Sequence, residues 1–436
     1  MAITGIKAIS ALGLKNISSS DKSVENNIND DIEVEKIELS EKLSDGSAND
    51  GTGINLQKGL IFGNTYTFRV TKFINGQPKT ITTINWEIKY HSLKQDKIVT
   101  LTSKSFSYYL RFDKNSLYDE KGNHPEMEDL CGRMIFVRAF IKDKNLSNRL
   151  EIWHHNRFRY IDRLIVEEQL LNRQITPYII DQASTSLCGT AIIFYIFAKY
   201  NPKDFFNFTK DLLRTGKAKY NDFEVTPHKK AYDMFEMSPE SKNWPKKIIK
   251  IGDSRKNKNK MYEADWLNLS VLRSASNDIL GVYKGDVDDT TAISWPKMML
   301  RLCKDFLGYK DVQGVNINTP IKKFTKDHLK IGLLINQINI EIGKGYKIAF
   351  LIDSDLIDYS EDKLKDLFKF EYHWVVLETP IKSIVEFDDS NNIIKKIDFV
   401  VFTWGTDIYV KKERYLKNPI TYEYFMKNFY GYIKMQ

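Results

Sequence analysis

Two side chains in one short stretch could carry thiol chemistry. Cys188 stands in SLCGTAIIFYIF at the start of an apolar run, and Gln182 precedes it by six positions. The run predicts a helix that begins near Cys188, with Ser184, Thr185 or Ser186 as its cap. The N–H groups and the dipole of a helix N-terminus favour the thiolate, the nucleophilic form of cysteine. We therefore expect a nucleophile whose thiol pKa lies below the free value of about 8.5.

A nucleophilic cysteine needs a base, and the partners of such sites meet in space rather than in sequence. The chain has seven histidines. His373 lies in YHWVVLETP, which is typical of a strand that is buried after its first residues. His228 and His328 lie beside lysines in polar segments that are typical of solvated surface. His373 is therefore the predicted base for Cys188.

The other cysteines and a histidine pair have simpler explanations. Cys131 and Cys303 are predicted to be structural, because free cysteine usually behaves as a small buried hydrophobe. Three scattered cysteines without a CxxC pair favour neither a disulfide framework nor a zinc site. His154 and His155 are neighbours in a predicted strand, so their side chains point to opposite faces. We expect no metal ion and no cofactor.

Gln182, Cys188 and His373 resemble the active site of papain-like cysteine peptidases. In that family a glutamine precedes the nucleophile by six positions, the cysteine opens a long helix, and an Asn-Ser-Trp-Gly motif follows the histidine. FTWG at 402–405 is similar to that motif. A finer similarity is to bacterial papain-like toxin and effector domains, whose patterns occur in SLCGTAIIFYIF, DLLRTGKAKYNDFEVTP, ADWLNLSVLRSASN and HWVVLETPI, within roughly residues 178–436. The resemblance implies that Gln182 helps to hold the oxyanion.

The third member of the site stays open at this stage. Phe402 stands where that family has asparagine, so a different residue must orient His373, or none does. A hairpin turn at DDSN would bring Thr403 or Asp407 near His373, whereas a turn at ETPI would bring Asp388 beside it. The first turn is better supported, because DDSN is rich in turn formers.

The elements that must position these residues follow two periodicities. Residues 53–158 alternate apolar and polar side chains around an Asn75-Gly76 turn, which predicts an all-β immunoglobulin-like sandwich without catalytic residues. After Asn156 the apolar spacing becomes helical and then mixes with strands. The chain is therefore predicted to be α+β, with a papain-like cysteine protease domain over 159–436.

The amino-terminal segment differs in composition. Residues 21–50 hold ten acidic and three basic side chains with little apolar surface. We expect disorder from about residue 16 to 52, and hence a disordered N-terminal segment over 1–52. The start MAITGIKAISALGLKN has neither a positive cluster nor a small-residue cleavage site, so we expect synthesis in the cytoplasm without a signal peptide.

Length and charge limit the class of protein. A chain of 436 residues with 42% hydrophobic and 28% charged residues is expected to form two domains. No apolar run approaches the roughly 18 residues of a membrane span, so no span is expected. The formal net charge of +8 includes a lysine-rich segment at 228–260. We interpret that segment as a solvated loop and expect no nucleic-acid partner.

The expected function is that of a thiol hydrolase acting on amide bonds, as a papain-like cysteine protease effector or toxin. The resemblance implies delivery into a competing or host cell by a specialised secretion system. It also implies a protein or peptide substrate there, and a cognate immunity protein or secretion-apparatus component as partner. Because one scaffold can host several reactions, deamidase, transglutaminase and cell-wall amidase activities remain alternatives. A catalytically inactive papain-like binding protein is a further alternative, which Phe402 favours.

Overall fold

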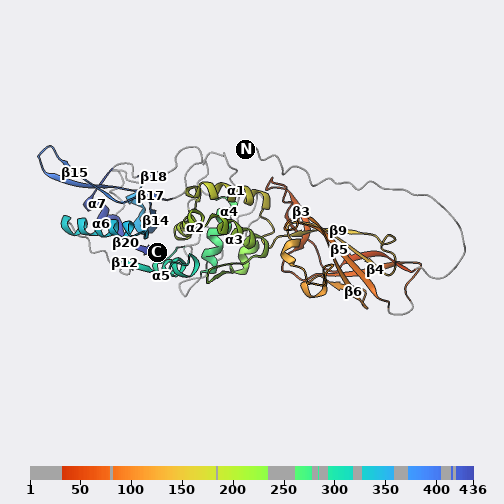
Figure 1. Cartoon of the computed structure of the whole chain (residues 1–436). Coiled ribbons are helices and arrows are strands. Elements are labelled where there is room, and N and C mark those ends of the chain that lie inside the picture. The colour runs from red at the N-terminus through yellow and green to blue at the C-terminus, as the bar shows by residue number, and fades with distance from the viewer. Residues whose placement is uncertain are drawn as a thin grey trace.

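The structure is a computed structural model and describes residues 32–78, 82–182, 185–233, 261–276, 283, 293–317, 327–357, 372–403, 414–415 and 419–436. Within these ranges the chain is α+β, with seven α-helices and several β-sheets, as predicted. Figure 1 shows an all-β part at one end, a cluster of helices in the middle, and a sheet with a projecting hairpin at the other end.

Residues 32–156 form the β region. Its strands are β1 (Glu33–Leu39), β2 (Ser44–Ser47), β3 (Leu56–Ile61), β4 (Thr67–Ile74), β5 (Ile84–Ser92), β6 (Lys97–Ser105), β7 (Tyr109–Arg111), β8 (Arg133–Phe140) and β9 (Leu150–His155), with short 3-10 helices at Lys114–Ser116 and Met127–Leu130. One sheet has the order β2-β3-β9-β8-β5-β6 and the other β1-β4-β7. Apolar side chains from both sheets, such as Phe68 and Trp86, fill one core, because alternate positions of each strand face inward.

The prediction of disorder is wrong for residues 32–52. β1 pairs antiparallel with β4, and β2 pairs antiparallel with β3. Glu33 is buried, and its carboxylate accepts the backbone N–H groups of Lys142 and Asp143, both at 2.8 Å. The acidic composition hid the strand, because apolar Val34 and Ile37 both reach the core across an irregularity in the register between them. Residues 1–31 of the predicted disordered segment lie outside the described residues.

The β region is joined to the next helix by a cap. The side chain of Asp162 lies at the N-cap of α1 (Arg163–Ile175) and accepts the N–H of Leu164 at 2.9 Å. Its other oxygen accepts the N–H groups of Gly51 at 2.9 Å and Gly53 at 3.3 Å, both from the loop between β2 and β3. One carboxylate therefore ties the β region to the first turn of the following helix.

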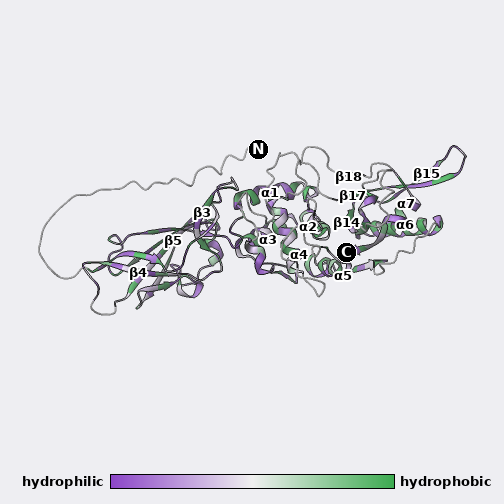
Figure 2. Cartoon of the chain, turned by 180° about the vertical axis from the view of Figure 1, so that it is seen from behind, coloured by the Kyte–Doolittle hydropathy of each residue, from purple (hydrophilic) through white to green (hydrophobic). Residues whose placement is uncertain are grey.

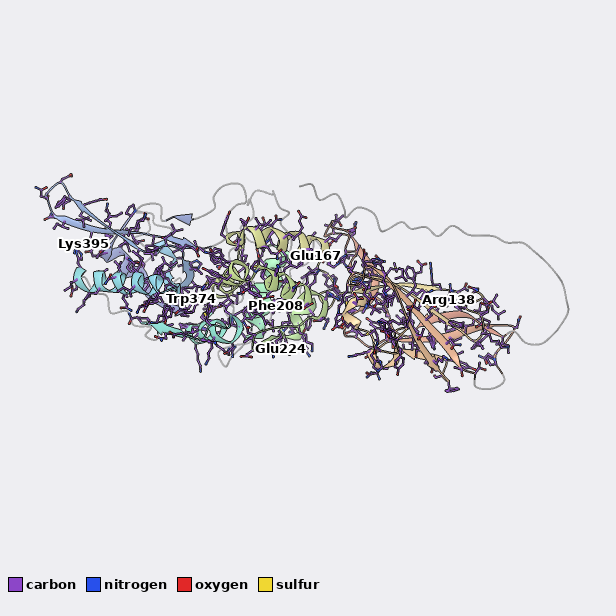
Figure 3. All side chains as sticks on the ribbon, in the orientation of Figure 1. Arg138, Glu167, Phe208, Glu224, Trp374 and Lys395 are labelled. Carbon is purple, nitrogen blue, oxygen red and sulfur yellow. The ribbon has the colours of Figure 1, made fainter. Side chains whose placement is uncertain are left out.

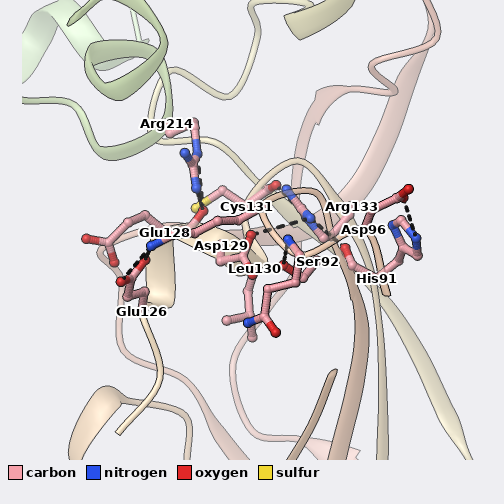
Figure 4. Close-up of polar contacts among 12 residues, drawn as sticks. His91, Ser92, Asp96, Glu126, Glu128, Asp129, Leu130, Cys131, Arg133 and Arg214 are labelled. Atoms are coloured by element: carbon pink, nitrogen blue, oxygen red, sulfur yellow. Dashed lines mark hydrogen bonds and ion pairs between the residues drawn. The ribbon is translucent and has the colours of Figure 1, made fainter. Parts of the chain in front are cut away.

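A second contact moves the expected domain boundary. The N–H of Arg157 donates to the carbonyl of Arg214 at 2.8 Å, and the Arg214 guanidinium donates to the carbonyl of Glu128 in the β region (Figure 4). Phe158, which the sequence placed in the first domain, is buried in the core of the helices that follow. The β region therefore ends near residue 156.

The remainder, from residue 157, is the α+β region. Its helices after α1 are α2 (Cys188–Tyr200), α3 (Pro202–Thr215), α4 (Glu263–Ala275), α5 (Pro296–Arg301), α6 (His328–Gly343) and α7 (Tyr422–Asn428). Its main sheet has the order β12-β20-β13-β14-β17-β18, formed by Val312–Val315, Phe429–Met435, Lys347–Asp353, Tyr372–Leu377, Val400–Phe402 and Arg414–Tyr415. Smaller sheets pair β10 (Ala218–Tyr220) with β11 (Phe223–Val225), and β15 (Lys382–Phe387) with β16 (Ile393–Asp398) and β19 (Ile420–Thr421).

The main sheet is covered on both faces. Trp374 and Val376 of β14 share a core with α2, whereas Val375 and Leu377 share a core with α6 and α7. Hydrophobic residues accordingly run through α2 and α6 (Figure 2), and α2 is apolar around its whole circumference because other elements surround it. Within the described ranges, no helix is long and apolar enough to cross a bilayer.

The projecting hairpin confirms the predicted turn at DDSN. β15 and β16 pair in the register Phe387 to Ile393, and the N–H of Asp388 donates to the carbonyl of Asn392 at 3.0 Å. The carboxylate of Asp388 accepts the N–H of Ser390 at 2.9 Å within this turn. β15 extends away from the main sheet in Figure 1. Asp388 is therefore remote from the start of β14, and the alternative turn at ETPI is wrong.

Candidate active site

Cys188 is the first residue of α2, as the sequence predicted. The predicted cap is wrong, because Leu187 occupies the N-cap position and makes no side-chain capping bond. The hydroxyl of Thr185 instead accepts the N–H of Leu187 at 3.3 Å, and Ser184 lies outside the described residues. The first N–H groups of α2 are therefore available to another acceptor.

Cys188 lies at this N-terminus. The backbone N–H groups of Trp374, Gly189 and Cys188 itself lower the pKa of its thiol. Cys188 is only 6% exposed, however, and burial raises the pKa of the thiol to about 11 despite these donors. The expectation of a pKa below the free value is thus wrong, because the lost solvation of the thiolate outweighs the helix N-terminus. The resting thiol is neutral near pH 7.

His373 is the second residue of β14 and is buried. Its Nε2 lies 2.7 Å from the hydroxyl oxygen of Thr403, which follows β17 on the neighbouring strand. Of the three residues considered as the third member of the site, Thr403 contacts the imidazole and Asp388 does not. Asp407 lies outside the described residues.

Cys188 meets β14 at the residue after His373. The Trp374 N–H interacts with the Cys188 sulfur, while the Trp374 side chain packs toward α2 and its Nε1–H donates to the carbonyl of Ser294 at 2.8 Å. Figure 3 shows Trp374 where the sheet meets the helices. Alternation along a strand places His373 and Trp374 on opposite faces. The structure therefore brings Cys188 to the backbone of β14 beside His373, and brings the imidazole to Thr403.

Gln182 is fixed in the loop that leads to Cys188. Its side-chain Nε2 donates to the carbonyl of Thr185 at 2.7 Å, and the Thr185 hydroxyl donates to the carbonyl of Gln182 at 2.7 Å. Gln182 is buried. These reciprocal bonds hold the carboxamide close to the first turn of α2.

A buried ion pair that sequence reasoning missed supports this loop. Arg173 of α1 donates from Nε and Nη2 to the two carboxylate oxygens of Asp265 of α4, both at 2.6 Å. Asp265 also accepts the N–H of Asp181 at 3.2 Å, next to Gln182. The only available signal was a carboxylate within the apolar segment ADWLNLS, since a fully buried charge needs a partner.

Two further contacts fit α2 closely to its surroundings. A Cβ added at Gly189 would lie 2.2 Å from the Cβ of Ser294, so the second position of α2 requires glycine. Phe402 stacks on Tyr195 of α2 with a ring-centroid distance of 3.8 Å. Phe402 therefore packs on α2, and Thr403 is the residue that contacts the His373 imidazole.

Comparison of the chain with family models, with curated proteins and with solved structures found no match. Within the described ranges, no three His, Cys, Asp or Glu side chains are grouped so that they could hold a metal ion.

Proposed function

We propose that this protein is a thiol hydrolase of amide bonds, built as a papain-like cysteine protease domain behind an immunoglobulin-like β region. The observation that carries the proposal is the position of Cys188 as the first residue of α2, a helix that packs on β14, the strand that carries His373. The N–H groups of a helix N-terminus stabilise the thiolate that attacks a carbonyl.

The reaction begins with a neutral thiol, because burial holds its pKa near 11. His373 acts as general base and takes the proton of Cys188 while the sulfur bonds to the carbonyl carbon of the substrate. Thr403 binds Nε2 of the imidazole, so we assign the proton transfer to Nδ1, for which the ring has to turn from its own face of β14 toward the start of α2. A hydroxyl can donate or accept a hydrogen bond, so Thr403 can stay hydrogen-bonded to the ring whether the ring is neutral or protonated.

The tetrahedral oxyanion is held by Gln182. The carboxamide has two N–H groups, one of which binds Thr185, and the other is available to the oxyanion. A donor of this kind contributes about 3 kcal/mol to transition-state stabilisation in other hydrolases. His373 then protonates the leaving nitrogen as the C–N bond breaks. Water hydrolyses the thioester, its hydroxyl joining the acyl carbon and its proton returning to sulfur.

The similarity to bacterial papain-like toxin and effector domains supports a biological setting. The protein is made in the cytoplasm and delivered by a specialised secretion system into a competing or host cell, where it cleaves a protein or peptide. A cognate immunity protein protects the producer. Deamidation, transglutamination or cell-wall amide cleavage by the same thiol are variants of this proposal, because each begins with the same attack on an amide carbon.

One observation favours a second candidate, a papain-like protein that binds but does not react. Cys188 is 6% exposed, and a nucleophile has to meet its substrate. In this alternative Cys188 only packs in the core around α2.

Intact-protein mass spectrometry after treatment with a thiol-reactive peptide electrophile separates the two candidates. The hydrolase is expected to gain one adduct at Cys188 in the folded state, and Cys188→Ala is expected to gain none. Cys303→Ala is the matched control, since it removes another buried cysteine and should still be labelled. Absence of an adduct at Cys188 in the folded wild type would favour the binding protein. Expression in bacteria, directed separately to cytoplasm and periplasm, then distinguishes cytoplasmic proteolysis from cell-wall cleavage.

A further inference from the structure

A row of aromatic side chains begins beside the candidate site. Trp295 directly follows Ser294, whose carbonyl binds the Trp374 indole. The Trp295 ring is 6.4 Å from that of Tyr372, and the Tyr372 ring is 5.0 Å from that of Tyr430, measured between centroids. Trp295 is 41% exposed although it is a large apolar side chain. The row is therefore accessible at the Trp295 end.

The other end of the row is acidic. The Tyr430 hydroxyl donates to Oδ2 of Asp353 at 3.1 Å, and the N–H of Asp355 donates to Oδ1 at 3.2 Å. Burial raises the pKa of Tyr430, and the charges of Asp353 and Asp355 raise it further. Both carboxylates thus contribute a negative potential where the row ends.

The row lies on the same side of the sheet as Cys188. Tyr372 and Trp374 are two positions apart on β14, so they share one face, and both side chains pack with the core that includes Cys188 of α2. Asp353 of β13 is paired directly with Tyr372. A substrate bound at Cys188 could therefore place a neighbouring side chain along the rings, with its end at Asp353.

We propose that Trp295, Tyr372, Tyr430 and Asp353 form a substrate subsite for a positively charged side chain, lysine or arginine, of a peptide. The inference rests on the proposed function and names the class of peptide that it acts on. Aromatic faces attract cations, and the methylene stem of a long basic side chain packs on such rings while its charged end reaches a carboxylate. An acidic side chain would be repelled by Asp353, and an uncharged apolar one would gain nothing from it.

Binding to the full-length Cys188→Ala protein tests the subsite without requiring any reaction. Three acetylated peptides that differ only in one residue, lysine, norleucine or glutamate, are titrated and followed by Trp fluorescence and calorimetry. The lysine peptide is expected to bind about 10-fold more tightly than the norleucine peptide, within the range of one cation–π contact and one charge pair. Trp295→Ala and Asp353→Asn should each reduce this preference several-fold. Phe106→Ala is the control, because Phe106 is an even more exposed aromatic in the β region.

The outcomes separate the subsite from the proposed function. Equal affinity for lysine and norleucine, or a preference that survives both Trp295→Ala and Asp353→Asn, would overturn the subsite. If Asp353→Asn fails to fold, the exposed Trp295→Ala decides alone. Electrophiles carrying the same three residues are then applied to the wild type. Faster labelling of Cys188 by the lysine probe supports both proposals, whereas a lysine preference in binding without any labelling overturns the hydrolase and retains the subsite.

Discussion

A cysteine is buried in the β region, and another is buried where α2 packs on β14, the α2–β14 junction. The surroundings of the two thiols differ. In the β region the thiol of Cys131 donates to the carbonyl of Met127 at 3.8 Å, and burial raises its pKa although Arg133 and Arg214 oppose this (Figure 4). At the junction the backbone N–H groups of Trp374 and Gly189 lower the pKa of the Cys188 thiol. A carbonyl acceptor favours the neutral thiol, whereas N–H groups favour the thiolate. Because burial raises the pKa of both thiols, the backbone groups around them distinguish the two cysteines.

The histidines show the same contrast. Burial lowers the pKa of His154 to about 3 and that of His155 to about 4. Each has a ring nitrogen on a backbone carbonyl, of Leu130 at 3.2 Å and Gln57 at 3.0 Å. A carbonyl can only accept, so these ring nitrogens donate, and burial keeps both rings neutral. His373 is bound instead to a hydroxyl, which adapts to either protonation state.

The strongest test of this comparison removes the ion pair that supports the Gln182 loop. Arg173→Met removes the guanidinium from the buried carboxylate of Asp265. We therefore expect the free energy of unfolding to fall by about 3–5 kcal/mol. Arg69→Met in the β region removes an exposed pair with Glu38 and should lower the stability much less, because water screens such a pair. Denaturant unfolding of both variants measures the difference. Equal losses of unfolding free energy in the two variants would show that the Arg173–Asp265 pair stabilises the fold no more than an exposed pair does.

A second test addresses the oxyanion. Gln182→Ala should reduce hydrolysis of a basic peptide anilide about 10²- to 10³-fold, since one oxyanion donor is lost. Alkylation of Cys188 forms no oxyanion and should keep its rate. The alkylation rate of Gln182→Ala is therefore the control for its rate of hydrolysis. A parallel fall in both rates would mean that Gln182 acts only by holding the loop.

A smaller effect is expected from Glu263 at the start of α4, close to Asp162, the residue that joins the regions. Glu263 is 1% exposed, and burial together with the charge of Asp162 raises its pKa well above the usual value. The folded chain therefore keeps a proton that the unfolded chain releases. Stability should fall as pH rises from about 4.5 toward the folded-state pKa, by at most about 1.4 kcal/mol per pH unit.

Glu263→Gln removes this proton and should flatten the decline. The advantage of the variant over wild type should therefore grow between pH 5 and pH 8 in thermal unfolding. Glu168→Gln changes an exposed glutamate of α1 and serves as the control. A constant difference for Glu263→Gln across this range would contradict the assigned protonation.

Local patterns in the sequence predicted much of this arrangement. The start of α2 at Cys188, the strand that carries His373 and the turn at DDSN all follow from apolar periodicity and turn chemistry. From the sequence, the third member of the site could be narrowed only to Thr403, Asp407 or Asp388. The register of β14 and β17 depends on the intervening hairpin, so the sequence alone does not select one of them.

Other features depend on tertiary contacts that no local pattern contains. Arg173 and Asp265 are 92 positions apart and are joined only when α1 packs on α4. The pKa of Cys188 depends on how deeply α2 is buried, which outweighed the local effect of the helix N-terminus. Strand β1 was not predicted, because the acidic composition of its segment concealed the apolar residues Val34 and Ile37.

The alkylation rate of Cys188 as a function of pH, in wild type and in His373→Ala, tests the central claim most directly. Peptide mapping of the alkylated protein isolates Cys188 from the other two cysteines. With His373 as base, the wild type should react at neutral pH and slow only as pH falls below the imidazole pKa, ordinarily about 6.5. His373→Ala should react slowly until pH approaches the thiol pKa of about 11. Identical pH profiles in the two proteins would show that His373 does not activate Cys188.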